Sequence, residues 1–319
     1  MRVEYLQPGQ TLPCRIQPLV EDGDAIAWAE ANRHFIEAHL LRHGGILFRR
    51  LELGGVAEFE QFIRTVAGEL LDYSYQSTPR RRVNGNIYTS TEYPANESIP
   101  LHNEMAYTHS WPLKIAFYCL TTAVQGGETP IADSRKVFAR IDPKIKERFM
   151  QRKIMYVRNY RDEIDLPWST VFQTQSKVEV EAYCRRAGIE LQWLDNNHLR
   201  TRQVCEAVRK HPLTGEVVWF NQAHLFHISN LAPKVRESLA AIYKEEHYPR
   251  NAYYGDGTPI ENAVLDHVRE AYRHEEISFA WQEGDVLLLD NMLAAHGRRP
   301  FTGPRQVVVG MAQPSTPAA

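Results

Sequence analysis

The first 71 residues alternate between helical and strand-like hydrophobic patterns. Apolar residues recur at helical spacing between positions 28 and 38, and Asp22 or Asp24 can cap a helix that ends near residue 43, before two glycines. The next segment, GILFRRL, has the continuous apolar character of a buried strand. A second helix is expected over about 57–71, with its apolar residues on one face. We expect this region to contribute packing and no chemistry.

From about residue 86 onward, short runs rich in β-branched and aromatic residues alternate with clusters of Gly, Pro, Asn and Asp. These runs are NIYTST, LKIAFYCL, KIMYVRNY, IELQWLD, GEVVWFN, ISFAWQ, DVLLLD and RQVVVGM. Many short strands of this kind favour a sandwich or barrel over a parallel α/β sheet. The remaining helical patterns fall at about 134–150, 176–187, 233–247 and 260–273. We therefore expect a mainly β protein with helices (α+β).

The chain shows no composition shift, flexible linker or internal repeat, so one domain is expected over 1–319. Within it, about 134–210 reads as a helical insert in the β core, and 314–319 reads as a disordered tail.

Composition and charge narrow the class of protein. The chain is 43% hydrophobic and 24% charged, and its net charge of −2 gives no footprint for nucleic acid or an anionic membrane. No apolar run approaches the roughly 18 residues of a spanning helix, and the first residues do not have the layout of a signal peptide. Four widely spaced cysteines indicate neither a disulfide framework nor a cysteine zinc site. These features predict a cytoplasmic protein.

Two His-x-carboxylate pairs occur in the chain, close to the roughly 1.6 that chance predicts, so context must distinguish them. His274 and Glu276 end a charged helical stretch, where a solvated helix face is the simpler interpretation. His102 and Glu104 follow a proline in extended chain, where residues two apart project from the same side. With one distant histidine, this pair would complete a facial triad that leaves three coordination positions open.

His296 is our candidate for that third ligand. It follows a buried strand and a turn, and the next residue, Gly297, leaves space beside a bound group. His224 and His227 flank apolar residues at helical spacing, which is typical of core or hydrogen-bonding roles. H-E-x-x-H is absent, so the chain has no helical zinc-protease motif.

A counter-charge for an α-keto acid is the second requirement. A keto acid that chelates a metal leaves its distal carboxylate to be held, and a planar guanidinium suits this better than an ammonium. Arg305 stands between a proline and an apolar strand, while Arg298 and Arg299 are poorer alternatives in the preceding turn. Thr129 can add a hydroxyl hydrogen bond to the same carboxylate. The simpler alternatives are a surface charge at a strand end for Arg305 and a turn residue for Thr129.

The segments HNEMAYTHSWPLKIAFYCL, GGETPIADS and LLLDNMLAAHGRRPF…PRQVVVGMA, in this order, resemble the taurine dioxygenase/clavaminate synthase superfamily of Fe(II)- and 2-oxoglutarate-dependent oxygenases. The resemblance spans about residues 30–313 and is greatest to the subgroup that contains the syringomycin-pathway amino-acid hydroxylase. It implies a double-stranded β-helix (jelly-roll) core, with His102, Glu104 and His296 as iron ligands. It also places Arg305 and Thr129 on 2-oxoglutarate, with O2 as the oxidant. Glu104 stands where the family more often has Asp, and Arg305 follows the distal histidine at a shorter spacing than is common.

The implied activity is hydroxylation of an unactivated carbon in a small amino acid or its derivative, free or presented by a carrier protein, with release of succinate and CO2. Because Glu104 occupies the position where family halogenases have a small residue, we expect hydroxylation and not halogenation. Desaturation by the same chemistry stays open, as do a zinc-dependent hydrolase and a non-catalytic jelly-roll binding protein. The segment TSTEYPANESIP, together with Trp111, Arg158 and Asn159, could line a substrate pocket, although structural roles are the simpler interpretation.

Overall fold

A computed structural model describes residues 2–6, 9–18, 24–72, 80–90, 93–161 and 165–315. Asp22, one of the two expected helix caps, lies outside these ranges. The other, Asp24, is the observed cap, and its carboxylate accepts hydrogen bonds from the backbone of Ile26 (3.1 Å) and Ala27 (2.8 Å). At the C-terminus, Pro314 is still the last residue of a strand and Ser315 N donates to Trp111 O, so order extends two residues into the expected tail. The rest of that tail, 316–319, lies outside the described residues.

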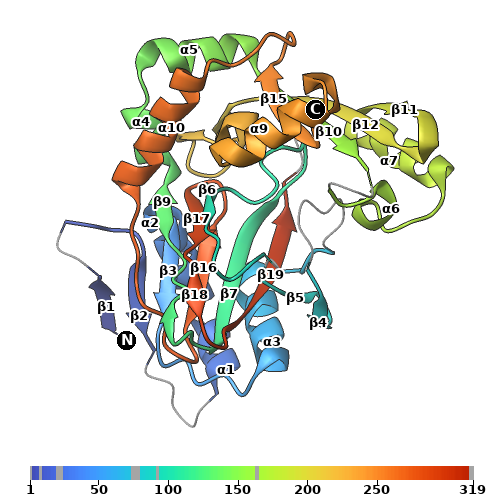
Figure 1. Cartoon of the computed structure of the whole chain (residues 1–319). Coiled ribbons are helices and arrows are strands. Elements are labelled where there is room, and N and C mark those ends of the chain that lie inside the picture. The colour runs from blue at the N-terminus through green and yellow to red at the C-terminus, as the bar shows by residue number, and fades with distance from the viewer. Residues whose placement is uncertain are drawn as a thin grey trace.

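An eight-stranded sheet forms the lower body of the molecule in Figure 1, with the strand order β1-β2-β3-β16-β7-β19-β5-β4. Its strands are β1 (Arg2–Tyr5), β2 (Cys14–Gln17), β3 (Gly45–Phe48), β16 (Val286–Asp290), β7 (Pro112–Thr121), β19 (Gln306–Pro314), β5 (Ile87–Thr89) and β4 (Arg82–Asn84). The β2–β3 pair is parallel and the other pairs are antiparallel. The longest contact in it joins β7 to β19, so residues from the middle and the end of the chain share its centre.

Helices cover one face of this sheet: α1 (Ala25–Ala31), α2 (Arg33–His43) and α3 (Val56–Ala67). The pattern predicts one helix over the first two, but they are separate because the chain departs from helical geometry at Asn32. α2 ends at Gly44, which has a φ of 79° in the left-handed region that glycine adopts without strain. Alternation along β7 places Ala116 and Tyr118 in the core beneath these helices and Ile115 and Phe117 in a second core on the opposite face.

A smaller three-stranded sheet lies against that opposite face. It consists of β6 (Ile99–His102), β17 (Ala294–Arg298) and β9 (Ile131–Asp133), in the order β6-β17-β9, and a short ribbon of β8 (Gln125–Gly126) with β18 (Phe301–Thr302) extends the same end. The pattern predicts a strand over 277–282, but the chain there forms only an isolated bridge between Ile277 and Ile131. Its Phe279 and Trp281 nevertheless fill the core between the two sheets.

A four-stranded sheet with helices forms the upper part of Figure 1. Its strands, in spatial order, are β11 (Glu190–Trp193), β12 (Leu199–Cys205), β10 (Ile154–Tyr160) and β15 (Arg250–Tyr254), and a separate hairpin joins β13 (Val208–Lys210) to β14 (Val217–Trp219). The helices are α4 (Ser134–Arg140), α5 (Pro143–Arg152), α6 (Trp168–Val171), α7 (Lys177–Ala187), α8 (Ala223–Phe226), α9 (Pro233–Ile242) and α10 (Asn262–Glu275), with 3-10 turns η1 (Asp195–Asn197), η2 (Ile228–Asn230) and η3 (Glu245–His247).

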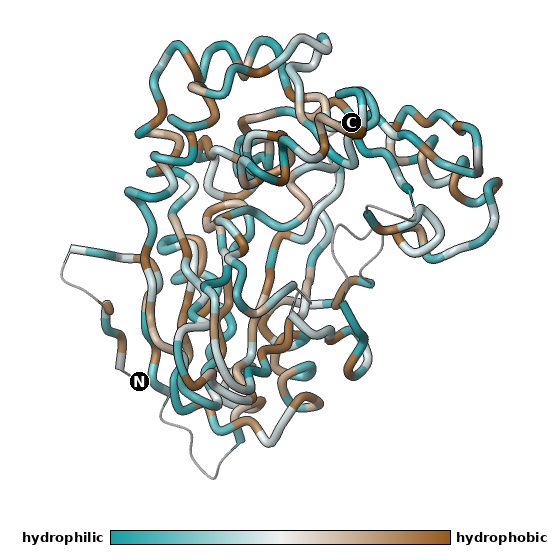
Figure 2. The backbone as a smooth tube through the Cα atoms, in the orientation of Figure 1, coloured by the Kyte–Doolittle hydropathy of each residue, from teal (hydrophilic) through white to brown (hydrophobic). Residues whose placement is uncertain are grey.

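The segment 134–210 contains helices together with β10 and β11, which match the predicted strand runs KIMYVRNY and IELQWLD, and β15, from beyond residue 210, completes their sheet. The helix predicted over 134–150 is divided in two because Pro143 begins a new helix, and Asp142 accepts a capping hydrogen bond from Lys144 N. Hydrophobic and hydrophilic positions alternate along the helices at the top of Figure 2, as expected of helices that bury one face. α10, for example, buries Leu265, Val268 and Tyr272.

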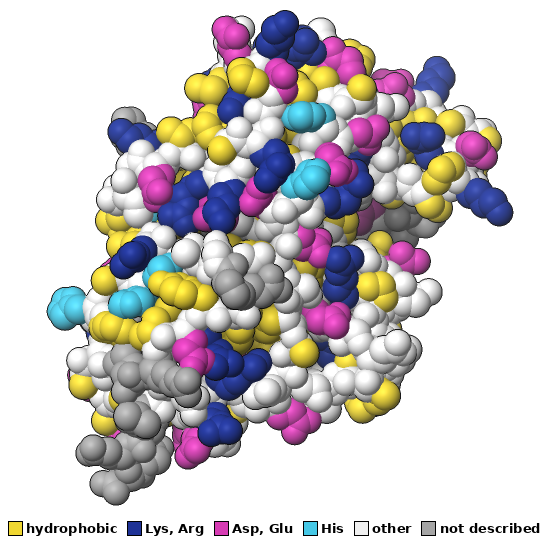
Figure 3. All heavy atoms as spheres, turned by 90° about the vertical axis from the view of Figure 1, so that its left-hand side faces the viewer, with side chains coloured by type: hydrophobic (Ala, Val, Ile, Leu, Met, Phe, Trp, Pro, Cys, Tyr) yellow, Lys and Arg dark blue, Asp and Glu magenta, His cyan; other side chains and the backbone are white. Residues whose placement is uncertain are grey.

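The distribution of surface charge and the state of the cysteines match what the composition predicts. Basic and acidic side chains are interspersed over the face shown in Figure 3. Within the described residues, no helix combines the length and the apolar character that crossing a membrane requires. All four cysteines are free and buried, and burial raises the pKa of Cys119 to about 12, which keeps its thiol protonated.

Candidate metal centre and pocket

The structure brings His102, Glu104 and His296 together. His102 ends β6 and lies directly opposite His296 on the antiparallel strand β17, with the two ring centroids 4.6 Å apart. One candidate ligand atom from each of the three side chains lies within 4.8 Å of the others. Glu104 does not continue the strand, however. It begins a turn in which Met105 has a φ of 56°, so the turn, and not strand alternation, directs its carboxylate to the histidines.

Both imidazoles are prepared to bind a cation. Nδ1 of His102 lies 2.8 Å from the carbonyl oxygen of Pro100, which only accepts hydrogen bonds. Nδ1 therefore carries the proton, and Nε2 has a free lone pair. Desolvation lowers the pKa of His102, and burial lowers the pKa of His296 well below its ordinary value, with His102 and Arg80 adding to the effect. Both rings are neutral at pH 7, the form that coordinates metal.

Side-chain amides hold the turn at Glu104 in place. Asn291, which is fully buried, accepts from Glu104 N (2.7 Å) and donates to Glu104 O (2.9 Å) and Pro112 O (2.8 Å). Asn103 donates to Asn291 O (2.6 Å), and Gln222 donates to Asn103 O (2.7 Å). These bonds satisfy the backbone of a buried turn that has no sheet partner of its own.

His224 belongs to the same support. Its Nε2–H donates to Leu101 O (2.9 Å), and burial lowers its pKa to about 3, so it stays neutral. His227 accepts from Ser229 N (3.1 Å) and caps the turn η2. The prediction of core or hydrogen-bonding roles for these two histidines is confirmed.

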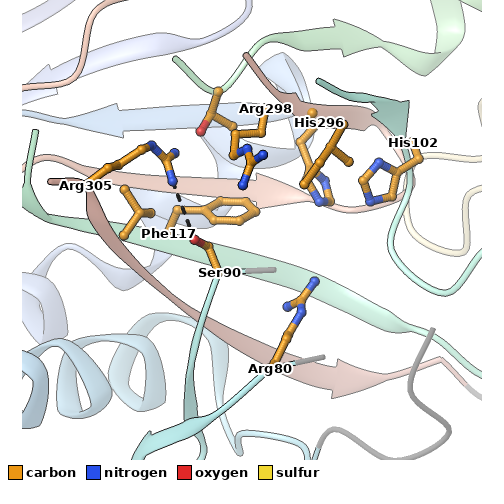
Figure 4. Close-up of a pocket in the computed structure, with 11 residues that line it drawn as sticks. Arg80, Ser90, His102, Phe117, His296, Arg298 and Arg305 are labelled. Carbon is orange, nitrogen blue, oxygen red and sulfur yellow. Dashed lines mark hydrogen bonds between the residues drawn. The ribbon is translucent and has the colours of Figure 1, made fainter. Parts of the chain in front are cut away.

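A pocket opens between the eight-stranded and three-stranded sheets, and the two histidines form one end of it (Figure 4). Its lining residues are Arg80, Ser90, Ile99, His102, Phe117, Thr129, His296, Gly297, Arg298, Arg305 and Val307. We call the cluster of His102, Glu104 and His296 the histidine end, and Arg305 with Thr129 the arginine end.

Arg305 is held at its end of the pocket by the Gly126-Gly127 turn. Its Nε donates to Gly127 O (2.8 Å), and Nη1 is 3.5 Å from Ser90 Oγ (Figure 4). A Cβ on Gly127 would lie 2.9 Å from Arg305 Cδ, and Gly127 has a φ of 77°, so the glycine both shapes the turn and admits the arginine. Burial, followed by the like charge of Arg298, lowers the pKa of Arg305 to about 10, and it remains a cation at neutral pH.

Thr129 lines the same pocket, two residues after Gly127, and is buried. Its hydroxyl oxygen accepts a hydrogen bond from the indole N–H of Trp281 (3.1 Å). Because that bond occupies a lone pair and not the proton, the hydroxyl can still donate to a ligand in the pocket.

The alternative arginines have other partners. Arg298 lines the pocket, but its guanidinium donates to the carbonyls of Tyr93 (3.0 Å), Pro94 (2.6 Å) and Glu97 (2.9 Å). Arg299 is half-exposed and pairs with Glu276, away from the pocket. The space expected beside Gly297 is also accounted for, because a Cβ there would lie 2.6 Å from Ile99 O; the glycine permits close approach of β6.

The other predicted pocket residues have structural positions. Trp111 packs against Phe220 (centroids 5.0 Å apart), and Arg158 and Asn159 lie on β10 in the upper sheet. In the segment TSTEYPANESIP, Ser90 and Ile99 line the pocket. Thr91 and Glu92 of the same segment lie outside the described residues. The pattern gives no sign of Arg80 or Asn291, because an arginine in an Arg-rich loop and an asparagine in a turn are ordinary surface residues.

The chain as a whole is similar to known proteins. The model of the taurine catabolism dioxygenase TauD, TfdA family matches residues 15–312. The dapdiamide synthesis protein DdaC of Enterobacter agglomerans is 44% identical over 288 residues, covering 90% of this chain and 88% of that protein. A clavaminate synthase-like protein of Arabidopsis thaliana is 28% identical over 297 residues, covering 88% and 85%.

Solved structures share the fold at low sequence identity. PvcB of Pseudomonas aeruginosa superposes with a TM-score of 0.55 at 14% identity, covering 94% of this chain and 85% of that one. AAD-2, solved in complex with Mn(II) and N-oxalylglycine, gives 0.55 at 12% identity, covering 100% and 99%. The predicted jelly-roll core with flanking helices is confirmed.

Proposed function

Because this chain belongs to the taurine catabolism dioxygenase TauD, TfdA family, we propose that His102, Glu104 and His296 bind its iron and that Arg305 and Thr129 bind its 2-oxoglutarate. The chain is an oxygenase that uses Fe(II), 2-oxoglutarate and O2. The observation that carries the assignment of residues is the convergence of three ligand atoms within 4.8 Å at the end of a pocket.

The donor set suits Fe(II). Two neutral imidazoles and one carboxylate form the 2-His-1-carboxylate set that is typical of non-haem iron oxygenases, and it leaves positions for a chelating co-substrate and O2. The Pro100 carbonyl orients the His102 ring, and the Asn291 amide orients the turn that carries Glu104. These bonds fix the orientation of the candidate ligands.

The arginine end suits the distal carboxylate of 2-oxoglutarate. Gly127 O and Ser90 fix the Arg305 guanidinium in the pocket, and the Thr129 hydroxyl supplies a second donor from the same loop. Phe117 and Val307 form an apolar part of the pocket wall, which helps to keep water away from bound 2-oxoglutarate. When bound, iron and 2-oxoglutarate activate O2, with release of succinate and CO2, for attack on a substrate C–H bond.

For the primary substrate we propose a small amino acid or amino-acid derivative, free or presented by a carrier protein. The likeness to a protein of dapdiamide synthesis supports a biosynthetic role. Glu104 supplies a carboxylate at the histidine end, which supports hydroxylation over halogenation. Desaturation remains the alternative outcome, since substrate placement decides between the two.

The decisive experiment is anaerobic titration of the protein with Fe(II) and 2-oxoglutarate, followed by a substrate screen for succinate formation. We expect a weak visible charge-transfer band on formation of the chelate, lost in His296→Ala. His274→Ala is the matched control, because His274 belongs to the chain's other His-x-Glu pair and is exposed on α10. Tightly bound zinc with no response to 2-oxoglutarate would instead identify a hydrolase.

A further inference from the structure

The hydroxyl of Thr129 is oriented by a neighbouring tryptophan. The indole N–H of Trp281 donates to Thr129 Oγ1 at 3.1 Å, and the two residues are 9% and 3% exposed. A threonine hydroxyl has one proton and two lone pairs and can otherwise rotate freely, whereas an indole N–H only donates. The bond therefore occupies a lone pair and turns the hydroxyl proton away from the tryptophan.

The segment that carries Trp281 is fixed on both sides of the indole. On one side, Ile277 and Ile131 exchange backbone hydrogen bonds of 2.8 and 2.9 Å, and Ile131 follows the threonine by two residues. On the other side, Gln282 N donates to the carboxylate of Asp285 (2.9 Å). These bonds hold the indole in place against the threonine, because they tie both residues to the same pair of backbone segments.

Trp281 also lies between the threonine and a second cavity. This cavity has a volume of about 230 Å³ and is lined by Trp281, Arg305 and the loop 121–128, in which Val124 is 78% exposed. Roughly 10–15 Å³ is enough to admit one water molecule, so the cavity can hold several. Because the threonine belongs to the wall of the pocket and the tryptophan to the wall of the cavity, the indole shields the hydroxyl from that water.

We propose that Trp281 is a positioning residue for the co-substrate and directs the Thr129 hydroxyl proton to the distal carboxylate of 2-oxoglutarate, an inference that rests on the proposed function. The indole strengthens that bond in two ways. It orients the hydroxyl before the ligand arrives, so binding does not have to fix the rotation. It also polarises the hydroxyl, because a group that accepts one hydrogen bond becomes a better donor of the next.

A double-mutant cycle tests this coupling. The dissociation constant of 2-oxoglutarate is measured under argon for Fe(II)-loaded wild type, Trp281→Phe, Thr129→Val and the double variant. We expect Trp281→Phe to weaken binding about three- to tenfold, the equivalent of one neutral hydrogen bond. The same substitution should have no effect in the Thr129→Val background. It should weaken binding again in the Thr129→Ser background, because serine keeps the hydroxyl.

Trp193→Phe is the matched control, because the Trp193 indole N–H donates to Glu181 (2.8 Å) in the upper part of the molecule, and its loss should leave 2-oxoglutarate affinity unchanged. An unchanged affinity in Trp281→Phe overturns the proposal. An equal loss in the threonine and valine backgrounds also overturns it, because the tryptophan then acts by packing alone. Full 2-oxoglutarate affinity in Thr129→Val would instead contradict the role of the threonine in the proposed function, and the inference with it.

A second measurement covers the case in which Trp281→Phe does not fold. Every tryptophan of the chain is replaced by β-(3-benzothienyl)alanine, which has the same shape with sulfur in place of the N–H group. In this protein, Thr129→Val should cost less 2-oxoglutarate affinity than it does in the natural protein, because the hydroxyl has already lost its donor. An equal cost in the two proteins overturns the proposal.

Discussion

At the histidine end of the pocket, the candidate ligands come from two short strands and a turn that buried side-chain amides hold together. At the arginine end, Arg305 precedes the strand β19, and a carbonyl of the glycine turn at Gly126-Gly127 accepts a hydrogen bond from its guanidinium. The first arrangement depends on contacts between distant segments, such as Glu104 with Asn291, which are 187 residues apart. The second also joins distant segments, because Gly127 and Arg305 are 178 residues apart, but it consists of direct hydrogen bonds of one side chain to Gly127 O and Ser90 Oγ. We therefore expect metal binding to depend on a network of buried amides, and co-substrate binding on a few direct contacts of one side chain.

Removing a ligand should have the largest effect. Glu104→Ala or His296→Ala should lower metal affinity and turnover by more than about a hundredfold, because even the loss of a partner that only orients a ligand costs about 10- to 100-fold. Mn(II) binding by calorimetry and succinate formation are the measurements. His274→Ala should behave like the wild type, and a ligand variant that retains Mn(II) affinity would remove its residue from the cluster.

Asn291→Ala tests the dependence of the histidine end on the fold. It removes the hydrogen-bond partner of three buried backbone groups of Glu104 and Pro112. Each unsatisfied group costs about 1–3 kcal/mol of folding free energy. We expect unfolding free energy to fall by at least about 3 kcal/mol and metal affinity to fall with it, measured by denaturant unfolding and Mn(II) titration. Asn32→Ala provides the comparison, because it removes a hydrogen bond from the Asn32 side-chain amide to Trp28 O in the helical layer. Equal effects of both variants on metal affinity would contradict a specific role for Asn291.

Arg305→Ala should weaken 2-oxoglutarate binding without changing metal binding. We expect 2-oxoglutarate affinity to fall on the order of 10- to 100-fold, because a charged hydrogen bond contributes about 1.5–3 kcal/mol, while Mn(II) affinity stays the same. Anaerobic titration with 2-oxoglutarate measures the first and calorimetry the second. If the 2-oxoglutarate affinity is unchanged, Arg298 and not Arg305 binds the distal carboxylate.

Lowering the pH should reduce the unfolding free energy of the protein through His224, which supports the histidine end. The folded pKa of about 3 lies below the ordinary value of 6.5, so the unfolded chain takes up a proton first and stability falls as pH drops below about 6.5. His224→Gln removes this titration and preserves a donor for Leu101 O. Between pH 7.5 and 5.5 the wild type should lose about 1.4 kcal/mol more unfolding free energy than the variant. Equal losses in denaturant titrations at the two pH values would show that His224 is not responsible.

Features with a signal in their own stretch of sequence were predictable, and features that depend on distant partners were not. β7, β16 and β19 are long apolar runs and were found from local pattern, whereas β12 and β15 carry many polar residues and were not. The spacing of His102 and Glu104 and the Gly126-Gly127 turn are local signals that lead to the site. Arg80 and Asn291 act through residues far away in the chain, so no periodicity around them reveals their positions. The break at Asp142-Pro143, by contrast, is a local stop signal that the wider helical pattern concealed.

The direct pairing of His102 on β6 with His296 on β17 has a consequence for biosynthesis. During translation, the first imidazole and Glu104 emerge from the ribosome long before their partner, and two donors alone make a weak site for Fe(II). With the ligand set proposed above, a nascent chain therefore lacks its third donor until β17 has emerged and paired with β6.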